Sequence, residues 1–320
     1  MRISRTCVVA AAVAGLVVGT PTAALADDGG FTIKDPRITE SSGLAASRAH
    51  PGVYWTHNDQ DGPYVYAVDS KSGETVARIT MKGVGKPRDM EAISVGPDGD
   101  VYVGDIGDNL NGKWDHVWIY RFPEPKELKD QTVRTTQYDV KYADGARNAE
   151  AMMVHPKTGR VYIGSKEEDG AGLYEGPAKL VAGRTNVFRK IHDIPWVTDG
   201  AFSPDGKRLV LRSYLSAESY RWPEMGEGEA LGIGYRGQSE SVTFTPDGRT
   251  MLVGAEGEQS EVYALKVEGG SDSPSGSGTS ESPSGKPAPA EETGLSGKGV
   301  LVLGLAGVAV VAWLGFRRKR

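Results

Sequence analysis

Residues 239–254 read SESVTFTPDGRTMLVG, and this stretch contains the pattern from which the fold is predicted. Ser241 to Phe244 alternate between polar and apolar residues and Met251 to Val253 are β-rich, so two short strands are predicted. Pro246, Asp247 and Gly248 lie between them, and residues of these types favour a tight turn. The stretch therefore predicts a β-hairpin.

The same pattern of strand, turn and strand occurs in five copies along the chain, and no sixth was found. Each copy has a small or acidic residue near its start. The first strands of the copies are expected at Ser41–Ala45, Asp89–Ser94, Asn148–Met153, Thr198–Phe202 and Ser239–Phe244. The repeat of about 47 residues is close to the period of a β-propeller blade, which has four strands.

The third and fourth strands complete the repeat. Third strands are expected at Tyr64–Val68, Val117–Phe122, Gly172–Glu175, Ser219–Trp222 and Glu261–Val267, and fourth strands at Thr75–Met81, Thr132–Tyr142, Asn186–Ile194 and Leu231–Tyr235. The fifth copy lacks its fourth strand, and Phe31–Ile38 is the unpaired segment that completes it. We therefore predict an all-β, five-bladed β-propeller closed by its N-terminal strand. A β-sandwich is the alternative, but sandwiches do not show this periodicity.

The two ends of the chain predict export and attachment. Residues 1–26 combine a basic start, an apolar run and a small-residue cleavage site, as in a secretory signal peptide. After the propeller domain at 27–268, residues 269–297 are rich in Ser, Pro and Gly and predict a flexible stalk. Residues 298–316 predict a transmembrane or sorting-signal helix, followed by a basic cytoplasmic tail at 317–320.

This order of stalk, Thr293-Gly294, apolar segment and basic tail resembles a cell-wall sorting signal, although the usual leucine is missing. We expect the domain on the extracellular face of the cell membrane or in the cell wall of a Gram-positive bacterium. Membrane contact is expected through the C-terminal helix alone.

Composition limits the possible partners. The net charge of -5 gives no electrostatic footprint for nucleic acid. We expect a monomer that binds an extracellular small molecule or a cell-surface ligand. Gly-x-Ser-x-Gly, His-Glu-x-x-His and P-loop motifs are absent from the sequence.

A ring of oxygen-bearing side chains is expected where the first strands of the blades line the channel. Its members are Ser42, Glu91, Glu150, Asp199 and Glu240. Carboxylates that face one another repel, so a cation is expected between them. With oxygen ligands, Ca²⁺ is the expected cofactor. The alternative is that each carboxylate accepts hydrogen bonds from backbone amides of the neighbouring inner strand.

This ring resembles the axial Ca²⁺ site of calcium-activated nucleotidases (apyrases), which are five-bladed propellers. Ser42, Glu91, Glu150 and Glu240 match that pattern, and Asp199 takes the place of a smaller polar residue. The resemblance implies Ca²⁺ binding. The segments Asp89–Glu91, Gly104–Asn109 and Tyr120–Pro125 also resemble a largely uncharacterised group of secreted bacterial β-propeller proteins.

Loops at one face of the propeller supply the remaining candidates. Residues expected to bind a ligand there are Arg88, Asn109, Arg147, Lys166 and Arg212. His57, Asp59 and Asp105 are candidate catalytic residues, each as a general base on a metal-bound water. Polar residues are also common in surface loops that have no such role.

The sequence thus favours a cell-surface ligand-binding or interaction module with an axial Ca²⁺. The first alternative is a Ca²⁺-dependent hydrolase of a phosphoanhydride, phosphoester or lactone. The second is a glycosidase, which needs two carboxylates about 5 to 9.5 Å apart in a metal-free channel.

Overall fold

The computed structural model describes residues 29–109, 112–233 and 238–267, and these residues form 21 β-strands and no helix. They belong to a compact unit that spans Met1–Asp272, while a second unit spans Ser273–Arg320. The segments predicted as signal peptide, apolar helix and basic tail lie outside the described residues, and so does the stalk. Within the described ranges, no helix is long and apolar enough to cross a membrane.

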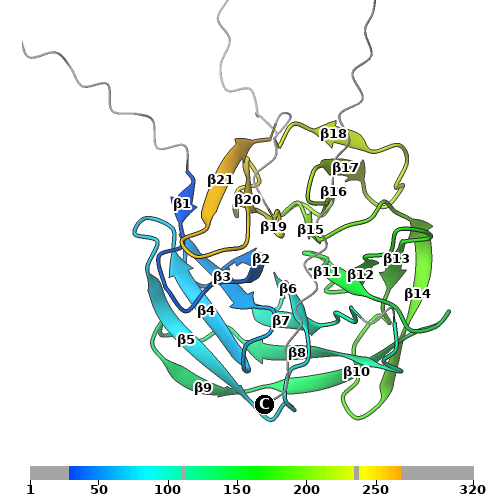
Figure 1. Cartoon of the computed structure of the whole chain (residues 1–320), viewed down its shortest axis with the longest axis horizontal. Coiled ribbons are helices and arrows are strands. Elements are labelled where there is room, and N and C mark those ends of the chain that lie inside the picture. Colours follow the sequence, from blue (N-terminus) through cyan, green and yellow to red (C-terminus); the bar gives the residue numbers. More distant parts are fainter. Residues whose placement is uncertain (1–28, 110–111, 234–237, 268–320) are drawn as a thin grey trace, which may run out of the picture. The chain divides into compact units, whose positions relative to one another are not determined.

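The strands form four sheets (Figure 1). The first contains β2 (Ser41–Ala46), β3 (Val53–Asn58), β4 (Tyr64–Asp69), β5 (Thr75–Lys82) and β9 (Gln131–Arg134). The second contains β6 (Met90–Val95), β7 (Asp100–Asp105), β8 (Val117–Pro123), β10 (Thr136–Tyr142), β14 (Thr185–Asp193), β13 (Gly172–Glu175), β12 (Val161–Ser165) and β11 (Ala149–Val154). The third contains β15 (Asp199–Phe202), β16 (Arg208–Arg212), β17 (Ala217–Arg221) and β18 (Glu229–Leu231). The fourth contains β19 (Ser241–Phe244), β20 (Thr250–Gly254), β21 (Glu261–Lys266) and β1 (Phe31–Thr32).

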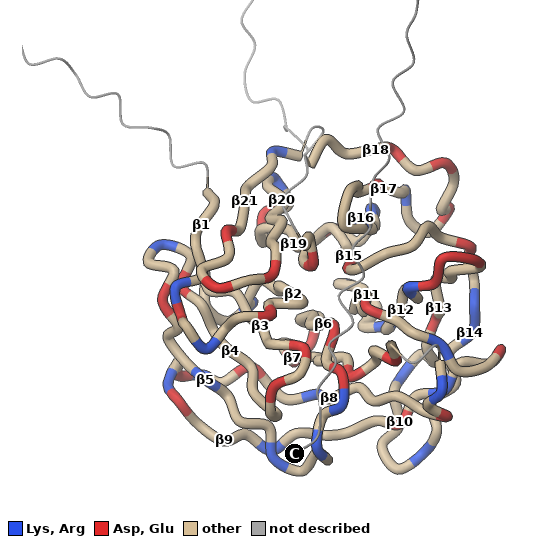
Figure 2. The backbone as a smooth tube through the Cα atoms, viewed as in Figure 1, with Lys and Arg blue, Asp and Glu red and all other residues tan. Residues whose placement is uncertain are grey.

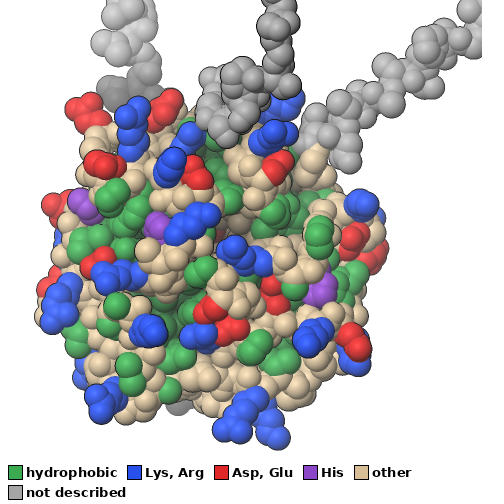
Figure 3. All heavy atoms as spheres, turned by 180° about the vertical axis from the view of Figure 1, so that it is seen from behind, with side chains coloured by type: hydrophobic (Ala, Val, Ile, Leu, Met, Phe, Trp, Pro, Cys, Tyr) green, Lys and Arg blue, Asp and Glu red, His purple; other side chains and the backbone are tan. Residues whose placement is uncertain are grey.

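The inner strands form a closed ring. β2 contacts β6, β6 contacts β11, β11 contacts β15, β15 contacts β19, and β19 returns to β2. Figure 1 shows the sheets arranged around this ring, with β5, β10, β14, β18 and β1 lying farther from the centre than the inner strands. Sheets repeated around an axis are the architecture of a β-propeller, as predicted. The reverse face is covered by charged side chains of both signs mixed with hydrophobic ones (Figure 3).

The N-terminal strand pairs as predicted but is shorter than predicted. β1 pairs antiparallel with β21 and is the outermost strand of the fourth sheet. It ends at Thr32 instead of Ile38. The Asp35 carboxylate accepts hydrogen bonds from the Arg37 backbone and guanidinium, and the Ile38 amide bonds to the Asp35 carbonyl at 3.0 Å. These local bonds turn the chain away from the sheet.

The single strand predicted at 132–142 is also wrong, because the segment serves two sheets. β9 pairs parallel to β5, whereas β10 pairs antiparallel to β8 and parallel to β14. Thr135 lies between the two strands, and its amide bonds to the Lys82 carbonyl at 2.8 Å. The strand predicted at 231–235 is misplaced, because β18 ends at Leu231 and shares that residue alone with the described part of the predicted strand. Residues 234–237 lie outside the described residues.

The core lies between neighbouring groups of strands. Between the strands that begin with β2 and with β6, Trp55 is fully buried and packs edge-on against Phe122, with ring centroids 6.5 Å apart. The Trp55 indole donates to Glu124 Oε1 at 2.6 Å, so its polar atom is also satisfied. Trp222 has the same role between β11–β14 and β15–β18, where it packs against Tyr162 and Phe202. This packing fixes the inner strands, and therefore the side chains that they carry.

Candidate functional site

Three of the inner strands have an irregularity at the positions that the sequence assigns to the ring. The pairing of β6 with β7 skips from Met90 to Ala92, and the pairing of β11 with β12 skips from Ala149 to Ala151. The pairing of β2 with β3 skips from Ser41 to Leu44. A bulge leaves its extra residue outside the ladder and redirects the side chain. Glu91 and Glu150 are these extra residues.

Glu91, Glu150 and Glu240 are all buried, with 6%, 4% and 4% of their surface exposed. Burial raises the pKa of Glu91 well above its usual value, and the carboxylates of Glu150 and Asp89 raise it further. Burial also raises the pKa of Glu150 to about 7, against the opposing effect of Lys166. Burial and the Glu150 carboxylate raise the pKa of Glu240 to about 7. Glu150 therefore lies within electrostatic reach of both Glu91 and Glu240, and its carboxylate disfavours their ionisation.

Lys166 supplies a positive charge to this cluster. Its ammonium lies 2.5 Å from Glu150 Oε1 and 2.9 Å from the Tyr214 hydroxyl. The same ammonium lies 4.9 Å from the Trp196 ring centroid and 4.8 Å from that of Tyr214, within cation–π range. Burial lowers the pKa of Lys166 but the Glu150 carboxylate raises it more, so the lysine stays charged. Lys166 thus supplies part of the positive charge that is expected between the carboxylates.

Further carboxyl groups extend the cluster towards the surface. Burial and the Glu240 carboxylate raise the pKa of Glu256 to about 7, while burial and the Asp59 carboxylate raise that of Asp89 to about 6. A hydrogen bond to Asp59, together with burial, raises the pKa of Glu40 to about 7. We call Glu40, Asp59, Asp89, Glu91, Glu150, Glu240 and Glu256 the acidic mouth. Figure 2 shows acidic positions on the strands around the centre of the ring.

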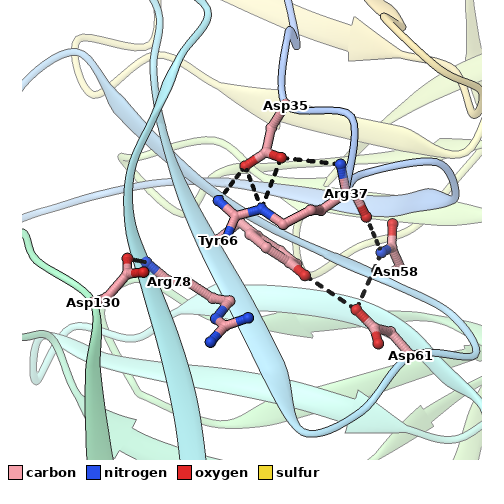
Figure 4. A network of polar contacts seen from close by, with 7 residues as sticks. All are labelled: Asp35, Arg37, Asn58, Asp61, Tyr66, Arg78 and Asp130. Atoms are coloured by element: carbon pink, nitrogen blue, oxygen red, sulfur yellow. Dashed lines mark hydrogen bonds and ion pairs between the residues drawn. The ribbon is translucent and has the colours of Figure 1, made fainter.

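A polar network holds the segment that carries Glu40 (Figure 4). The Asn58 side-chain carbonyl accepts from the backbone amides of Thr39 and Glu40, each at 3.1 Å. The Asn58 amide group donates to the Arg37 carbonyl at 2.8 Å and to Asp61 at 3.3 Å. The chain before β2 is thereby fixed to the end of β3.

Gly107 lies directly against two acids of the mouth. A Cβ atom at this position would be 2.5 Å from Asp89 Oδ2 and 2.7 Å from Glu91 Oε1. Any larger residue therefore has to displace these carboxylates.

The remaining two members of the predicted ring are engaged elsewhere. Asp199 accepts from the Val242 amide of the neighbouring inner strand at 2.7 Å, which is the alternative arrangement considered for the ring acids. The Ser42 hydroxyl donates to the Glu40 carbonyl at 3.2 Å. The five predicted positions are therefore not equivalent.

The arginines proposed as ligand-binding residues also have internal partners. Arg88 lies between Trp114 and Trp118, with ring centroids 4.0 and 3.7 Å from Cζ, and donates to the His116 carbonyl at 2.8 Å. Arg147 forms ion pairs with Asp144 and Glu167 at 3.1 and 2.6 Å.

Arg212 is fully buried beneath the mouth instead of lying on a surface loop. Its Nη1 donates to the carbonyls of Ser241 and Gly254. Burial lowers its pKa to about 10, against the opposing effect of Asp199 and Glu240. Nε and Nη2 have no hydrogen-bond partner among the described residues.

The three predicted catalytic residues differ in their access to the mouth. His57 is completely buried, and burial lowers its pKa to about 4. Asp105 is also completely buried and accepts from the Asp89 amide at 2.8 Å and the Tyr120 hydroxyl at 2.5 Å. Asp59 is half-buried at the mouth. Asn109 donates to Asp89 Oδ2 at 3.1 Å, which brings it to the same rim.

The arrangement of these carboxyl groups is not that of a preformed metal centre. Across residues 29–109, 112–233 and 238–267, no three His, Cys, Asp or Glu side chains are grouped so that they could hold a metal ion. The side-chain atoms of the acidic mouth that could coordinate an ion are carboxylate oxygens, which suit Ca²⁺ chemically. Sequence reasoning had not placed Glu40 at the site and gave Asp89 and Glu256 no role, because their proximity arises from loops of different sheets.

No family model and no curated protein matches the chain. Solved structures with similar folds include a hydrazine synthase from Kuenenia stuttgartiensis, at 14% identity and a TM-score of 0.41, covering 67% of this chain and 61% of that one. They also include a gluconolactonase from Xanthomonas campestris, at 12% identity and a TM-score of 0.44, covering 74% and 89% of the two chains. The assignment of this chain to the β-propellers rests on its strand order and its ring of inner strands.

Proposed function

We propose that this protein is an extracellular ligand-binding module, a five-bladed β-propeller whose acidic mouth binds Ca²⁺. The blade count treats the eight-stranded sheet as two blades, β6-β7-β8-β10 and β11-β12-β13-β14, joined through the parallel pairing of β10 with β14. Each blade then contributes one strand to the inner ring.

The charge imbalance at the mouth carries this proposal. Seven carboxyl groups share the mouth, and Lys166 forms an ion pair with one of them, Glu150, at 2.5 Å. The raised pKa values of Glu150, Glu240 and Glu256 are the electrostatic consequence, because ionised carboxylates lose hydration on burial and repel one another. A divalent cation removes both penalties. Binding of such an ion would therefore favour the ionised form of these carboxylates.

The glutamates redirected by the bulges and their neighbours would hold the ion. Glu91, Glu150 and Glu240 are the proposed carboxylate ligands, and Asp89 is close to Glu91. Asp199 is not included, because the Val242 amide already occupies its carboxylate. Ca²⁺ is the proposed ion because it accepts oxygen ligands with flexible geometry, and water molecules would complete its shell.

Location and partners are proposed from the ends of the sequence. A signal peptide at 1–26 and an apolar segment at 298–316 fit export and attachment at the cell surface. We propose that the module is monomeric and that its partner is a small molecule or a cell-surface ligand outside the cell.

Binding is better supported than hydrolysis. A phosphate or lactone hydrolase needs a free base and free cations around the ion. Arg88 and Arg147 are instead held by aromatic rings or by acids, and Asp105 accepts from the Arg88 and Asp89 amides and the Tyr120 hydroxyl. These residues build the rim and leave the carboxylates as its chemically active part.

Calorimetric titration of the full chain with CaCl₂ at pH 7.5 tests the proposal. We expect saturable binding of one ion per chain, a loss of affinity of at least tenfold in Glu91→Gln and in Glu240→Gln, and weaker binding of Mg²⁺. Glu127→Gln is the matched control, because Glu127 is 74% exposed and pairs only locally with Lys129. Absence of a Ca²⁺ signal in a folded wild-type sample would refute the proposal.

A further inference from the structure

A second cavity lies at the opposite end of the same channel. It has a volume of about 350 Å³ and is lined by the later residues of the inner strands, such as Leu44, Ile93 and Phe244. In β6, Ile93 and Val95 follow Glu91, so one strand carries an acid at one end of the channel and apolar side chains at the other. The cavity is thus separate from the acidic mouth and uses none of its carboxylates.

The chemistry of this cavity is that of a small-molecule site. Its volume lies within the range of about 300 to 1,000 Å³ that is usual for ligand pockets, and its lining is mainly apolar. Prolines of the repeated turns, Pro51, Pro156, Pro204 and Pro246, contribute to the lining. Because proline restricts the backbone, this part of the cavity is rigid before a ligand binds.

Arg48 makes the cavity selective for charge. It is the one charged residue that lines the cavity, it is exposed, and its guanidinium forms no hydrogen bond or ion pair with any residue that the structure describes. The carboxylate shown beside this segment, that of Glu124, is already engaged: it accepts from the Arg48 and Ala49 amides at 3.1 and 2.9 Å and from the Trp55 indole at 2.6 Å. An unpaired guanidinium beside an apolar cavity complements a carboxylate that is attached to an apolar body.

The polar atoms within the lining point to the same ligand class. Ser47 and Ser94 already accept hydrogen bonds from the amides of His50 and Val154. The Thr243 hydroxyl has no hydrogen-bond partner within the described part of the chain. The cavity thus offers few polar groups and one free charge, so a sugar or a nucleotide would leave most of its own polar groups unsatisfied.

We infer that this cavity binds a small amphipathic carboxylate, with its alkyl or aryl body among Leu44, Ile93 and Phe244 and its carboxylate on Arg48. The ligand needs no metal ion, because Arg48 supplies the charge.

Displacement of the fluorophore 1-anilinonaphthalene-8-sulfonate from the full chain, measured in EDTA, tests this inference. Octanoate is the competitor, and 1-octanol is the uncharged comparison with the same body. We expect octanoate to displace the fluorophore and Arg48→Gln to raise its midpoint at least fivefold, with the octanol midpoint unchanged. Arg184→Gln is the control, because Arg184 is exposed and does not line the cavity.

Ala46→Phe distinguishes this cavity from other apolar surfaces, because Ala46 lines it and a phenyl group would fill it. We expect this variant to lose the displaceable fluorescence. Three results would each overturn the inference. The first is octanoate binding in Ala46→Phe equal to that of wild type, and the second is a midpoint in Arg48→Gln within twofold of wild type. The third is no displacement of the fluorophore by octanoate. Because EDTA removes divalent ions, these outcomes are independent of Ca²⁺ binding at the acidic mouth.

Discussion

The Lys166 ammonium donates a hydrogen bond to Glu150 Oε1 at 2.5 Å. Lys166 directly follows β12, and Glu150 lies at the bulge of β11. The backbone fixes this pair, since the Lys166 amide also bonds to the Asn148 carbonyl at 3.0 Å. The ammonium is within the electrostatic reach of Glu91, Glu240 and Glu256, whose pKa values it lowers. Lys166 therefore favours the ionised form of these four glutamates.

Lys166→Met removes that cation and leaves Glu150 buried without its partner. Breaking a buried pair from one side costs about 3 to 5 kcal/mol, and we expect a loss near the lower figure at pH 8 because the mouth has one open side. Urea denaturation in EDTA measures this. Lys129→Met is the control: the Lys129–Glu127 pair has the similar distance of 2.6 Å but is exposed, so its loss should leave the stability close to that of wild type. Equal effects of the two substitutions would contradict the role of Lys166.

The ion-free protein should become more stable as the pH falls from 8 to 6. The pKa values of Glu150, Glu240 and Glu256 are raised from 4.5 to about 7 in the folded state. The folded state therefore binds more protons than the unfolded state between about pH 4.5 and 7, and stability is lost as the pH rises through this window. Each proton taken up contributes about 1.4 kcal/mol per pH unit.

Denaturation midpoints in EDTA across this pH range test the prediction. Glu240→Gln should flatten the dependence, whereas Glu127→Gln should leave it unchanged. Below about pH 6.5 the buried His57 acts in the opposite direction: its pKa is lowered to about 4, so its contribution to stability is lost as the pH falls towards 4. A stability that is flat or rises from pH 6 to 8 would contradict the predicted electrostatics.

Gly107→Ala should impair cation binding without removing any charge. Its Cβ would lie 2.5 Å from Asp89 Oδ2 and 2.7 Å from Glu91 Oε1, so both carboxylates have to move. We expect at least tenfold weaker Ca²⁺ binding by calorimetry. Gly85→Ala is the matched control, because the nearest atom to its Cβ would be 4.0 Å away. An affinity equal to wild type in Gly107→Ala would show that these two acids do not hold the ion.

Asp105→Asn should destabilise the fold, because Asp105 is a buried acceptor for the Asp89 amide and the Tyr120 hydroxyl. The amide group of asparagine adds a donor where donors already converge, at a cost of about 3 kcal/mol. Asp193→Asn is the control, since Asp193 is 90% exposed. Urea denaturation measures both variants, and a cost below about 1 kcal/mol for Asp105→Asn would contradict its structural role.

The repeat predicted much of this fold. Alternating strands around turns such as Pro246–Gly248 gave the inner strands, and the unpaired Phe31 segment gave the closing strand. The break at Thr135 was not predictable from local preference, because both halves of 131–142 are β-rich and their separate partners are fixed by tertiary pairing.

The candidate site was predicted only in part. Glu91 and Glu150 were found from their place in the repeat, but their bulges are a property of strand register, which does not appear in residue type. Asp199 occupies the same place in its repeat without a bulge, and it pairs regularly with Arg212 and binds a backbone amide. His57 has a polar side chain, yet it is completely buried, with its ring close to Gly43: a Cβ at that glycine would be 3.2 Å from His57 Nε2.

Ca²⁺ binding at the acidic mouth should appear in the melting temperature of the full chain, measured in EDTA and in millimolar Ca²⁺ beside Glu91→Gln and Glu150→Gln. An ion at about 100 times its dissociation constant that binds only the folded state adds roughly 2.7 kcal/mol of stability. We predict a rise in melting temperature for wild type that both variants lose and that Glu127→Gln keeps. No rise in the wild type, or an equal rise in Glu91→Gln and Glu150→Gln, would contradict Ca²⁺ binding at the acidic mouth.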